Sequence, residues 1–141
     1  MSEIEAVRPR FERVVREYLE LGDGEQLIID EDGDIPVRYE SAMYFMRLVD
    51  RDPALVQVFA YVLRDVQSSE SLLEALNSIN QQIVTARVFW FENNVIAAAE
   101  TPVSTVDVDE LRHLCWAIGS LAAWADTDLQ GRFGGRMAGA D

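Results

Sequence analysis

Residues 86–100, ARVFWFENNVIAAAE, carry the pattern that decides the fold class. Two runs rich in aromatic, β-branched and small apolar residues, 86–91 and 95–100, are typical of β-strands. Between them lie Asn93 and Asn94, and asparagine tolerates the positive φ angles of a two-residue turn. The stretch therefore predicts an antiparallel hairpin.

A helix with a well-marked start follows this hairpin. Pro102 cannot donate a backbone hydrogen bond and ends the second strand. Asp107 can cap a helix, and Glu110 stands three residues later, as in a capping box. Val106 and Leu111 have the spacing of a hydrophobic staple. The last helix is therefore predicted to begin at Asp107.

This last helix is apolar around most of its circumference. Trp116 and Trp124, eight residues apart, add a second apolar face to the main stripe, so the helix is expected to be covered on two sides. A sheet, a tail or another subunit could supply the second cover. The main stripe consists of Leu111, Leu114, Cys115, Ile118, Leu121, Ala122, Ala125 and Leu129.

The chain before the hairpin also begins with a helix. Phe11, Val14 and Tyr18 belong to one apolar stripe at helical spacing. Because proline fits only in the first helical turn, this helix is predicted to start near Pro9, and Gly22 is a candidate stop.

Strands are predicted next at residues 26–30, 35–40, 43–49 and 55–66. Asp-Gly at 32–33 indicates a tight hairpin between the first two. A helix remains possible over 55–66, because apolar residues on both faces obscure the period.

A second helix is predicted over residues 69–83, with Ser69 as a cap. It carries Asn77 and Asn80 on one face, although asparagine is a poor residue inside a helix. Either these side chains bond to nearby backbone, or they contact a bound chain.

The resulting element order is α-β-β-β(-β)-α-β-β-α, which predicts an α+β fold with helices against an antiparallel sheet. A single domain over residues 1–135 is expected. The glycine-rich end suggests a flexible C-terminal tail over 136–141.

The charge balance excludes several classes of partner. The chain has 25 acidic and 12 basic residues, a net charge of −13 at pH 7. Nucleic acids and anionic membranes both require a basic face, so neither is expected, whereas a basic protein segment would be attracted. No signal peptide is recognisable, and a lone Cys115 suits a reducing cytoplasm.

Catalytic, cofactor and metal sites are not predicted. His113 and Cys115 are two apart on a helix and point to different sides, which argues against a nucleophile–base pair. The acidic run over 30–34 fails the EF-hand pattern, since Gly33 stands at loop position 4 and Ser41 at position 12. A solvated hairpin tip is the favoured interpretation.

Several strands are apolar on both faces. Either helices cover both faces of the sheet, or one face binds a partner or a second copy. The candidate residues for such a peptide or dimer surface are Tyr44, Met46, Leu48, Asn77, Asn80, Trp90, Trp116 and Trp124.

Four segments in this order resemble the YbjN family of bacterial proteins, which share the type III secretion chaperone-like fold. They are the acidic hairpin leading to residues 35–39, the helix segment 72–80, the aromatic hairpin, and the last helix from Trp124 to Gly135. The resemblance covers roughly Arg10 to Gly135 and supplies no catalytic residues.

The resemblance implies a small, non-enzymatic, peptide-binding chaperone or adaptor, often a homodimer. By analogy of fold, the protein would hold a partner segment against apolar sheet or helix surface. The alternative is a self-assembling regulatory or structural module that has no client chain.

Overall fold

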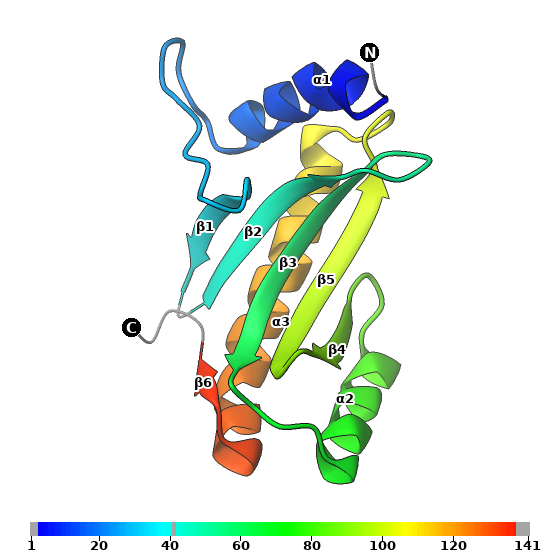
Figure 1. Cartoon of the computed structure of the whole chain (residues 1–141). Coiled ribbons are helices and arrows are strands. Elements are labelled where there is room, and N and C mark those ends of the chain that lie inside the picture. The colour runs from blue at the N-terminus through cyan, green and yellow to red at the C-terminus, as the bar shows by residue number, and fades with distance from the viewer. Residues whose placement is uncertain (1–2, 41, 138–141) are drawn as a thin grey trace.

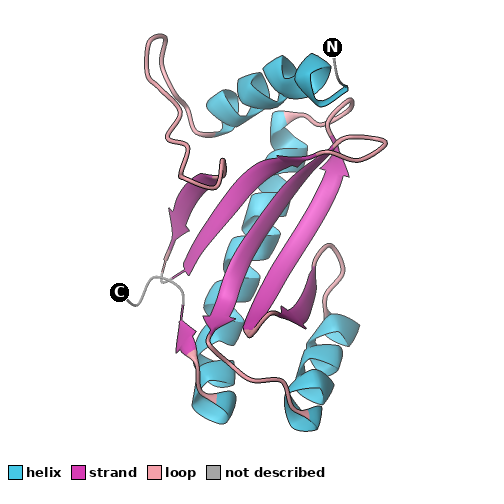
Figure 2. Ribbon diagram, in the orientation of Figure 1, coloured by secondary structure: helices cyan, strands magenta, loops and turns pink. Residues whose placement is uncertain are grey.

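The computed structural model describes residues 3–40 and 42–137, which form an antiparallel sheet with helices packed on one face (Figures 1 and 2). The predicted α+β class is confirmed. The elements are α1 (Glu3–Tyr18), β1 (Ile35–Tyr39), β2 (Ala42–Val49), β3 (Leu55–Arg64), α2 (Glu70–Gln82), β4 (Arg87–Phe91), β5 (Asn94–Pro102), α3 (Val108–Phe133) and β6 (Arg136–Met137).

The strand order is β1-β2-β3-β5-β4, and β6 pairs with the end of β3. Every pair is antiparallel, including the central β3–β5 pair, in which Phe59 lies opposite Ala98. The sheet is therefore not a simple meander, because α2 and β4 are inserted in the chain between its two central strands.

Helix α3 crosses the back of the sheet and forms most of the core with β2, β3 and β5 (Figure 1). Leu111, Ile118 and Leu129 are fully buried along it. Gly119 allows the closest approach, because a Cβ there would lie 2.8 Å from Cγ of Tyr39 in β1. Asp107 caps the helix as predicted, accepting a hydrogen bond from the Glu110 N–H at 2.8 Å.

The predicted start of α1 near Pro9 is wrong. The helix is already formed at Glu3 and contains Pro9 in its interior, where the ring removes one backbone hydrogen bond. Ile4 and Val7 pack against the core from the turns before the proline, and this burial offsets the lost bond. Gly22 does not end the helix: α1 stops at Tyr18, and Glu20 takes the positive φ angle of 55°.

The strand predicted over 26–30 does not form. A turn closes between Asp30 and Asp34, whose backbone groups hydrogen-bond at 2.8 Å, but β1 begins only at Ile35. Residues 26–30 form no strand beside the open edge of β1, and Ile28 and Ile29 are 76% and 54% exposed.

The remaining elements differ little from the prediction. Residues 55–64 form a strand and not a helix, and Ser69 caps α2 by accepting from the Leu72 N–H at 3.1 Å. The turn of the aromatic hairpin is Glu92-Asn93, one residue earlier than predicted, with φ angles of 48° and 65°.

The segment expected to be a flexible tail, 136–141, starts with a strand. Gly134 and Gly135 take positive φ angles, the chain reverses, and Arg136–Met137 pairs with β3 as β6. Residues 138–141 lie outside the described residues.

Candidate functional site

The two faces of the sheet have different surroundings. All three helices lie on one side, which we call the helix face, and within residues 3–40 and 42–137 no helix covers the other side, the open face (Figure 2). The idea that helices cover both faces is therefore wrong for the described chain, and no described helix packs on the apolar residues of the open face.

The structure places the four candidate surface residues of β2 and β4 on the helix face of the sheet. Tyr44 and Met46 are 2% and 0% exposed beneath the helices, so neither forms an accessible surface. Leu48 and Trp90 also point to the helix face and pack partly against the core. The indole N–H of Trp90 donates to the carbonyl of Val66 at 2.8 Å, which satisfies its polar atom inside the fold.

The open face carries a cluster of aromatic rings. Phe45 and Phe59 stack with ring centroids 5.3 Å apart, and Tyr61 meets Phe59 edge-on at 5.9 Å. Phe89 and Phe91 project from β4 on the same face, and Phe91 is 56% exposed. The sequence showed that Phe45, Phe89 and Phe91 alternate with the core residues but did not show which set faces outward.

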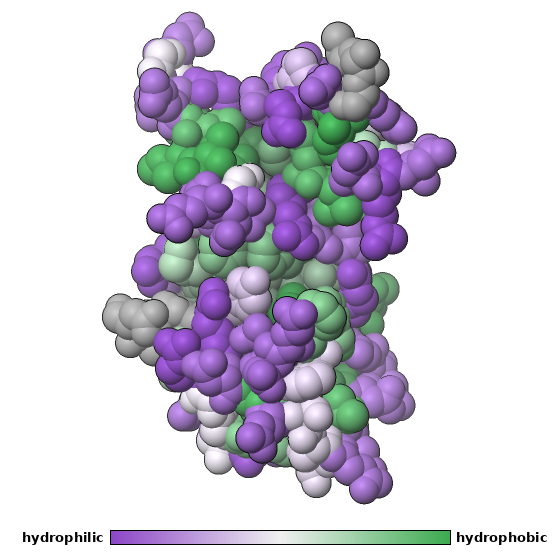
Figure 3. Space-filling model, viewed as in Figure 1, coloured by the Kyte–Doolittle hydropathy of each residue, from purple (hydrophilic) through white to green (hydrophobic). Residues whose placement is uncertain are grey.

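These rings border a groove of about 390 Å³, which we call the open-face groove. Its lining residues are Arg47, Gln57, Phe59, Tyr61, Phe89, Phe91, Ile96 and Ala98. Figure 3 views this face and shows apolar groups at its surface between polar ones. Five of the eight lining residues are aromatic or aliphatic chains larger than alanine, which is the composition of a surface that packs against apolar side chains.

A chain of polar contacts crosses the open face beside this groove. Arg47 in β2 donates to Gln57 in β3 at 2.8 Å, and Gln57 donates to Glu100 in β5 at 2.7 Å. Arg87 in β4 completes the chain with two bonds to Glu100 at 2.7 and 3.0 Å. Each of four neighbouring strands thus contributes one polar side chain.

Glu100 is held in its ionised form by this arrangement. Burial opposes its charge, but the hydrogen bonds from Arg87 and Gln57, with the nearby positive charges of Arg87 and Arg51, lower the pKa of the carboxyl below its usual value.

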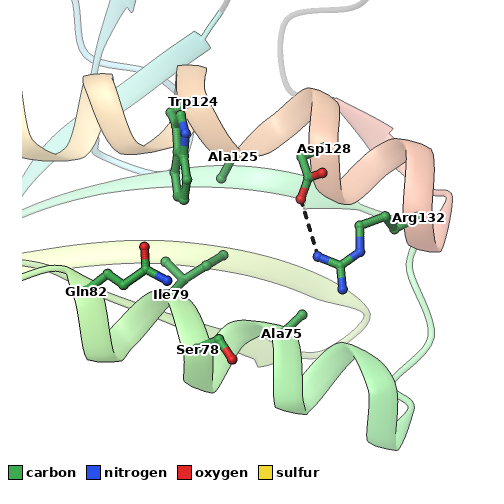
Figure 4. Close-up of a pocket in the computed structure, with 8 residues that line it drawn as sticks. All are labelled: Ala75, Ser78, Ile79, Gln82, Trp124, Ala125, Asp128 and Arg132. Atoms are coloured by element: carbon green, nitrogen blue, oxygen red, sulfur yellow. Dashed lines mark hydrogen bonds and ion pairs between the residues drawn. The ribbon is translucent and has the colours of Figure 1, made fainter.

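A second exposed surface lies between α2 and α3. A groove of about 470 Å³, the α2–α3 groove, is lined by Ala75, Ser78, Ile79, Gln82, Trp124, Ala125, Asp128 and Arg132. In Figure 4, Trp124 projects from α3 towards α2, and Asp128 and Arg132 form an ion pair of 3.3 Å at one end.

This second surface continues along α3 to Trp116. A neighbouring groove of about 330 Å³ is lined partly by Trp116, Val84 and His113. Trp116 and Trp124 are 59% and 61% exposed, so the sequence prediction of a second apolar face on α3 is correct. The segments 75–86 and 113–125, which form most of this surface, contain no Asp, Glu, Lys or Arg, and the ion pair of Asp128 with Arg132 lies at one end of it.

Asn80 and Asn77 have different surroundings. The side chain of Asn80 donates to the carbonyl of Val88 at 2.9 Å and accepts from the N–H of Val88 at 2.8 Å. The interpretation that Asn80 bonds to nearby backbone is therefore correct. Asn77 is exposed on α2.

The thiol of Cys115 is buried in the core. It lies 3.8 Å from the sulfur of Met46, and burial raises its pKa to about 11. His113 is exposed and contacts the hydroxyl of Thr85 at 3.0 Å. A buried, protonated thiol is a poor nucleophile, so these two residues form no catalytic pair.

The acidic run contains the one group of possible metal ligands found among the described residues. Oxygen atoms of Asp30, Asp32 and Asp34 lie within 4.8 Å of one another. The Asp30 carboxylate already accepts from the N–H groups of Asp32 and Asp34, at 3.0 and 2.9 Å, which makes a self-stabilised turn.

Among the described residues, no helix has the length and apolar character that crossing a bilayer requires.

Comparison with solved structures reveals the same fold in chaperone complexes. A chain from the structure titled "Crystal Structure of the ExsC-ExsE Complex" has a TM-score of 0.65 and 16% identity, covering 84% of this chain and 92% of that chain. A chain from "Structure of the HopA1-SchA Chaperone-Effector Complex" has a TM-score of 0.63 and 9% identity, with coverages of 84% and 94%. At these identities the likeness shows the fold alone.

Among curated proteins, no sequence matches the chain. A family model does match, over residues 10–141, and its description is "T3SS (YopN, CesT) and YbjN peptide-binding chaperone 1". Since this match spans nearly the whole chain, the protein belongs to the TY-Chap1 family of peptide-binding chaperones.

Proposed function

We propose that this chaperone holds a segment of a client protein across the open face of its sheet, without catalysing a reaction. The observation that carries the proposal is the open-face groove, an aromatic surface over which no described helix lies. Fellow chaperones of the family bind peptides, and the groove is the apolar concave surface that suits such a ligand.

The contacts in this groove would come from side chains. Residues of the open face point away from the sheet plane, whereas strand addition requires a free strand edge. On β4 that edge is closed at Val88 by Asn80. A client segment would therefore insert apolar side chains among Tyr61, Phe89 and Phe91.

Peptide binding measured by fluorescence anisotropy tests this proposal. Phe91→Ser removes an exposed ring, so the fold should persist while binding of an apolar peptide weakens by about tenfold. Trp124→Ser, a comparable loss of an exposed ring on the helix side, is the matched control and should leave affinity unchanged. Loss of affinity in Trp124→Ser with retention in Phe91→Ser would move the site to the α2–α3 groove.

A second candidate function is self-assembly through the α2–α3 surface. Two facing segments without charged residues, bearing exposed Trp116 and Trp124, are unusual on a chain of net charge −13. Copies of the chain repel one another, so an uncharged patch is where a homodimer would form. Sedimentation of the wild type and of a Trp116→Ser/Trp124→Ser variant tests this, since the variant should be monomeric if the patch is the interface.

We further infer a bacterial, cytoplasmic setting. The inference rests on the YbjN resemblance and on Cys115, an unpaired thiol that suits a reducing compartment.

A further inference from the structure

Arginine supplies the charge at the open-face groove. Arg47 is the single charged residue in its described lining, and its guanidinium carbon lies 4.5 Å from the centroid of the Phe59 ring. At the far end of β3, Arg64 lies 4.0 Å over the ring of Tyr61. Among the described residues, neither guanidinium lies within ion-pair distance of a carboxylate.

Three acids near this groove are already paired or buried, whereas Glu92, the residue after Phe91, is exposed. Glu100 accepts hydrogen bonds from Arg87 and Gln57, as described above. Asp34, close enough to Arg47 to feel its charge, is 8% exposed. Asp65, the residue after Arg64, is paired with Arg136 at 2.5 Å. The charged side chain that lines the groove itself, Arg47, is therefore positive, although the chain as a whole is acidic.

We propose that the open-face groove selects client segments in which acidic residues alternate with apolar ones. This inference rests on the proposed function and names the class of peptide. Apolar side chains would pack among the rings, and carboxylates would pair with Arg47 and Arg64. A guanidinium can keep its flat face on an aromatic ring while its N–H edge binds a carboxylate in bidentate fashion.

Whether a bound peptide responds to the nearby arginines or to the net charge of the chain depends on the distance to each group of charges. The sequence alone favoured a basic partner, because the net charge of −13 attracts cations over long distances. At physiological ionic strength the Debye length is about 8 Å, so distant surface acids are largely screened from a peptide in the groove. The two arginines contact the peptide directly and are screened much less.

Twin synthetic peptides provide the test. One alternates Leu or Phe with Glu, and the other carries Lys at every Glu position. Their affinities for the whole chain are measured by fluorescence anisotropy at physiological salt. The variants are Arg47→Gln/Arg64→Gln, which removes the two charges, and Arg13→Gln as control, because Arg13 is exposed on α1 in the helix layer. Circular dichroism and urea unfolding verify that each variant is folded.

We expect the Glu peptide to bind more tightly than the Lys peptide. The double variant should bind the Glu peptide about tenfold more weakly, while Arg13→Gln binds it as the wild type does. Equal affinity for both peptides, or preference for Lys, overturns the acidic selectivity but leaves the proposed function in place, provided that Phe91→Ser still weakens binding. If the control weakens binding as much as the double variant, the effect is one of net charge and the inference is wrong. If neither peptide binds, the proposed function at this groove fails as well.

Discussion

Asn80 closes the edge of the sheet by binding both backbone groups of Val88, donating to its carbonyl at 2.9 Å and accepting from its N–H at 2.8 Å. A helix side chain thus takes the place that a further strand would occupy beside β4. An exposed strand edge invites pairing with another chain, and this contact occupies the edge of β4 at Val88.

Replacing this residue should therefore destabilise the protein and uncover the edge. Asn80→Ala leaves the N–H and carbonyl of Val88 without their partners, which costs about 1–3 kcal/mol of unfolding free energy. Urea unfolding measures the loss, and light scattering follows association through the freed edge. Asn77→Ala, one turn earlier and exposed, should change stability by less than about 0.5 kcal/mol. Equal effects of the two substitutions would show that the Val88 contacts contribute nothing.

Gly119 should tolerate no side chain. A Cβ would lie 2.8 Å from Cγ and 3.2 Å from Cβ of Tyr39, which are the inner atoms of that side chain and not its mobile end. Although alanine favours a helix, Gly119→Ala should lower the unfolding free energy by about 1–3 kcal/mol through overpacking. Gly131→Ala in the same helix meets nothing within 4 Å and should stabilise by about 0.5 kcal/mol. A stabilised Gly119→Ala variant would contradict the close contact of α3 with β1.

The Cys115 thiol should be inert in the folded protein. It is 1% exposed, and burial raises its pKa to about 11, so at pH 8 little thiolate is present and reagents cannot reach it. A chromogenic disulfide reagent should label Cys115 within seconds in the protein unfolded by urea, and negligibly in the folded protein. Because the folded state holds the thiol proton more tightly, this residue's contribution to stability is present below about pH 9 and is lost as the pH rises towards 11. Rapid labelling of native protein at pH 8 would contradict the burial.

Glu100 should make the unfolding free energy of the protein depend on pH in the acidic range. The pKa of its carboxyl is lowered in the folded state, so its contribution is present above the pKa of the unfolded chain, about 4.5, and is lost as the pH falls below that value. In Glu100→Gln the unfolding free energy should change less between about pH 5 and pH 3 than in the wild type. Glu74→Gln, an exposed change on α2, should leave the wild-type dependence intact. An unchanged pH profile in Glu100→Gln would mean that Arg87 and Gln57 do not hold its charge.

Local patterns predicted much of the fold. Caps such as Ser69 and Asp107, and strands such as those around Phe89 and Val95, depend on neighbours in the sequence, so their positions were correct to within a residue or two. The errors at Pro9 and at residues 26–30 have a different origin. A core contact outweighed the proline penalty in one case, and in the other Ile28 and Ile29 stay exposed and form no strand beside the open edge of β1.

The candidate surface was harder to predict than the fold. A period of two shows that Tyr44 and Phe45 face opposite sides, but both faces of β2 are apolar, so hydrophobicity does not show which one the helices cover. The charged residues Arg47 and Arg87 mark the open face, because arginine side chains are rarely buried in a helix-covered core. The exposed Trp116 and Trp124 were found because α3 is apolar beyond the width of one buried stripe.

The order of the strands also bears on how quickly the molecule can fold. Phe59 and Ala98 face each other at the centre of the sheet, yet α2 and β4 stand between them in the chain. Closing so long a loop costs conformational entropy before the contacts between the two strands can form. We therefore expect the β3–β5 pairing to limit the rate of folding. The local hairpins β1–β2 and β4–β5 can form beforehand as separate units. Substitutions at Gln57 or Glu100 would then slow folding, whereas substitutions in α1 would mainly hasten unfolding.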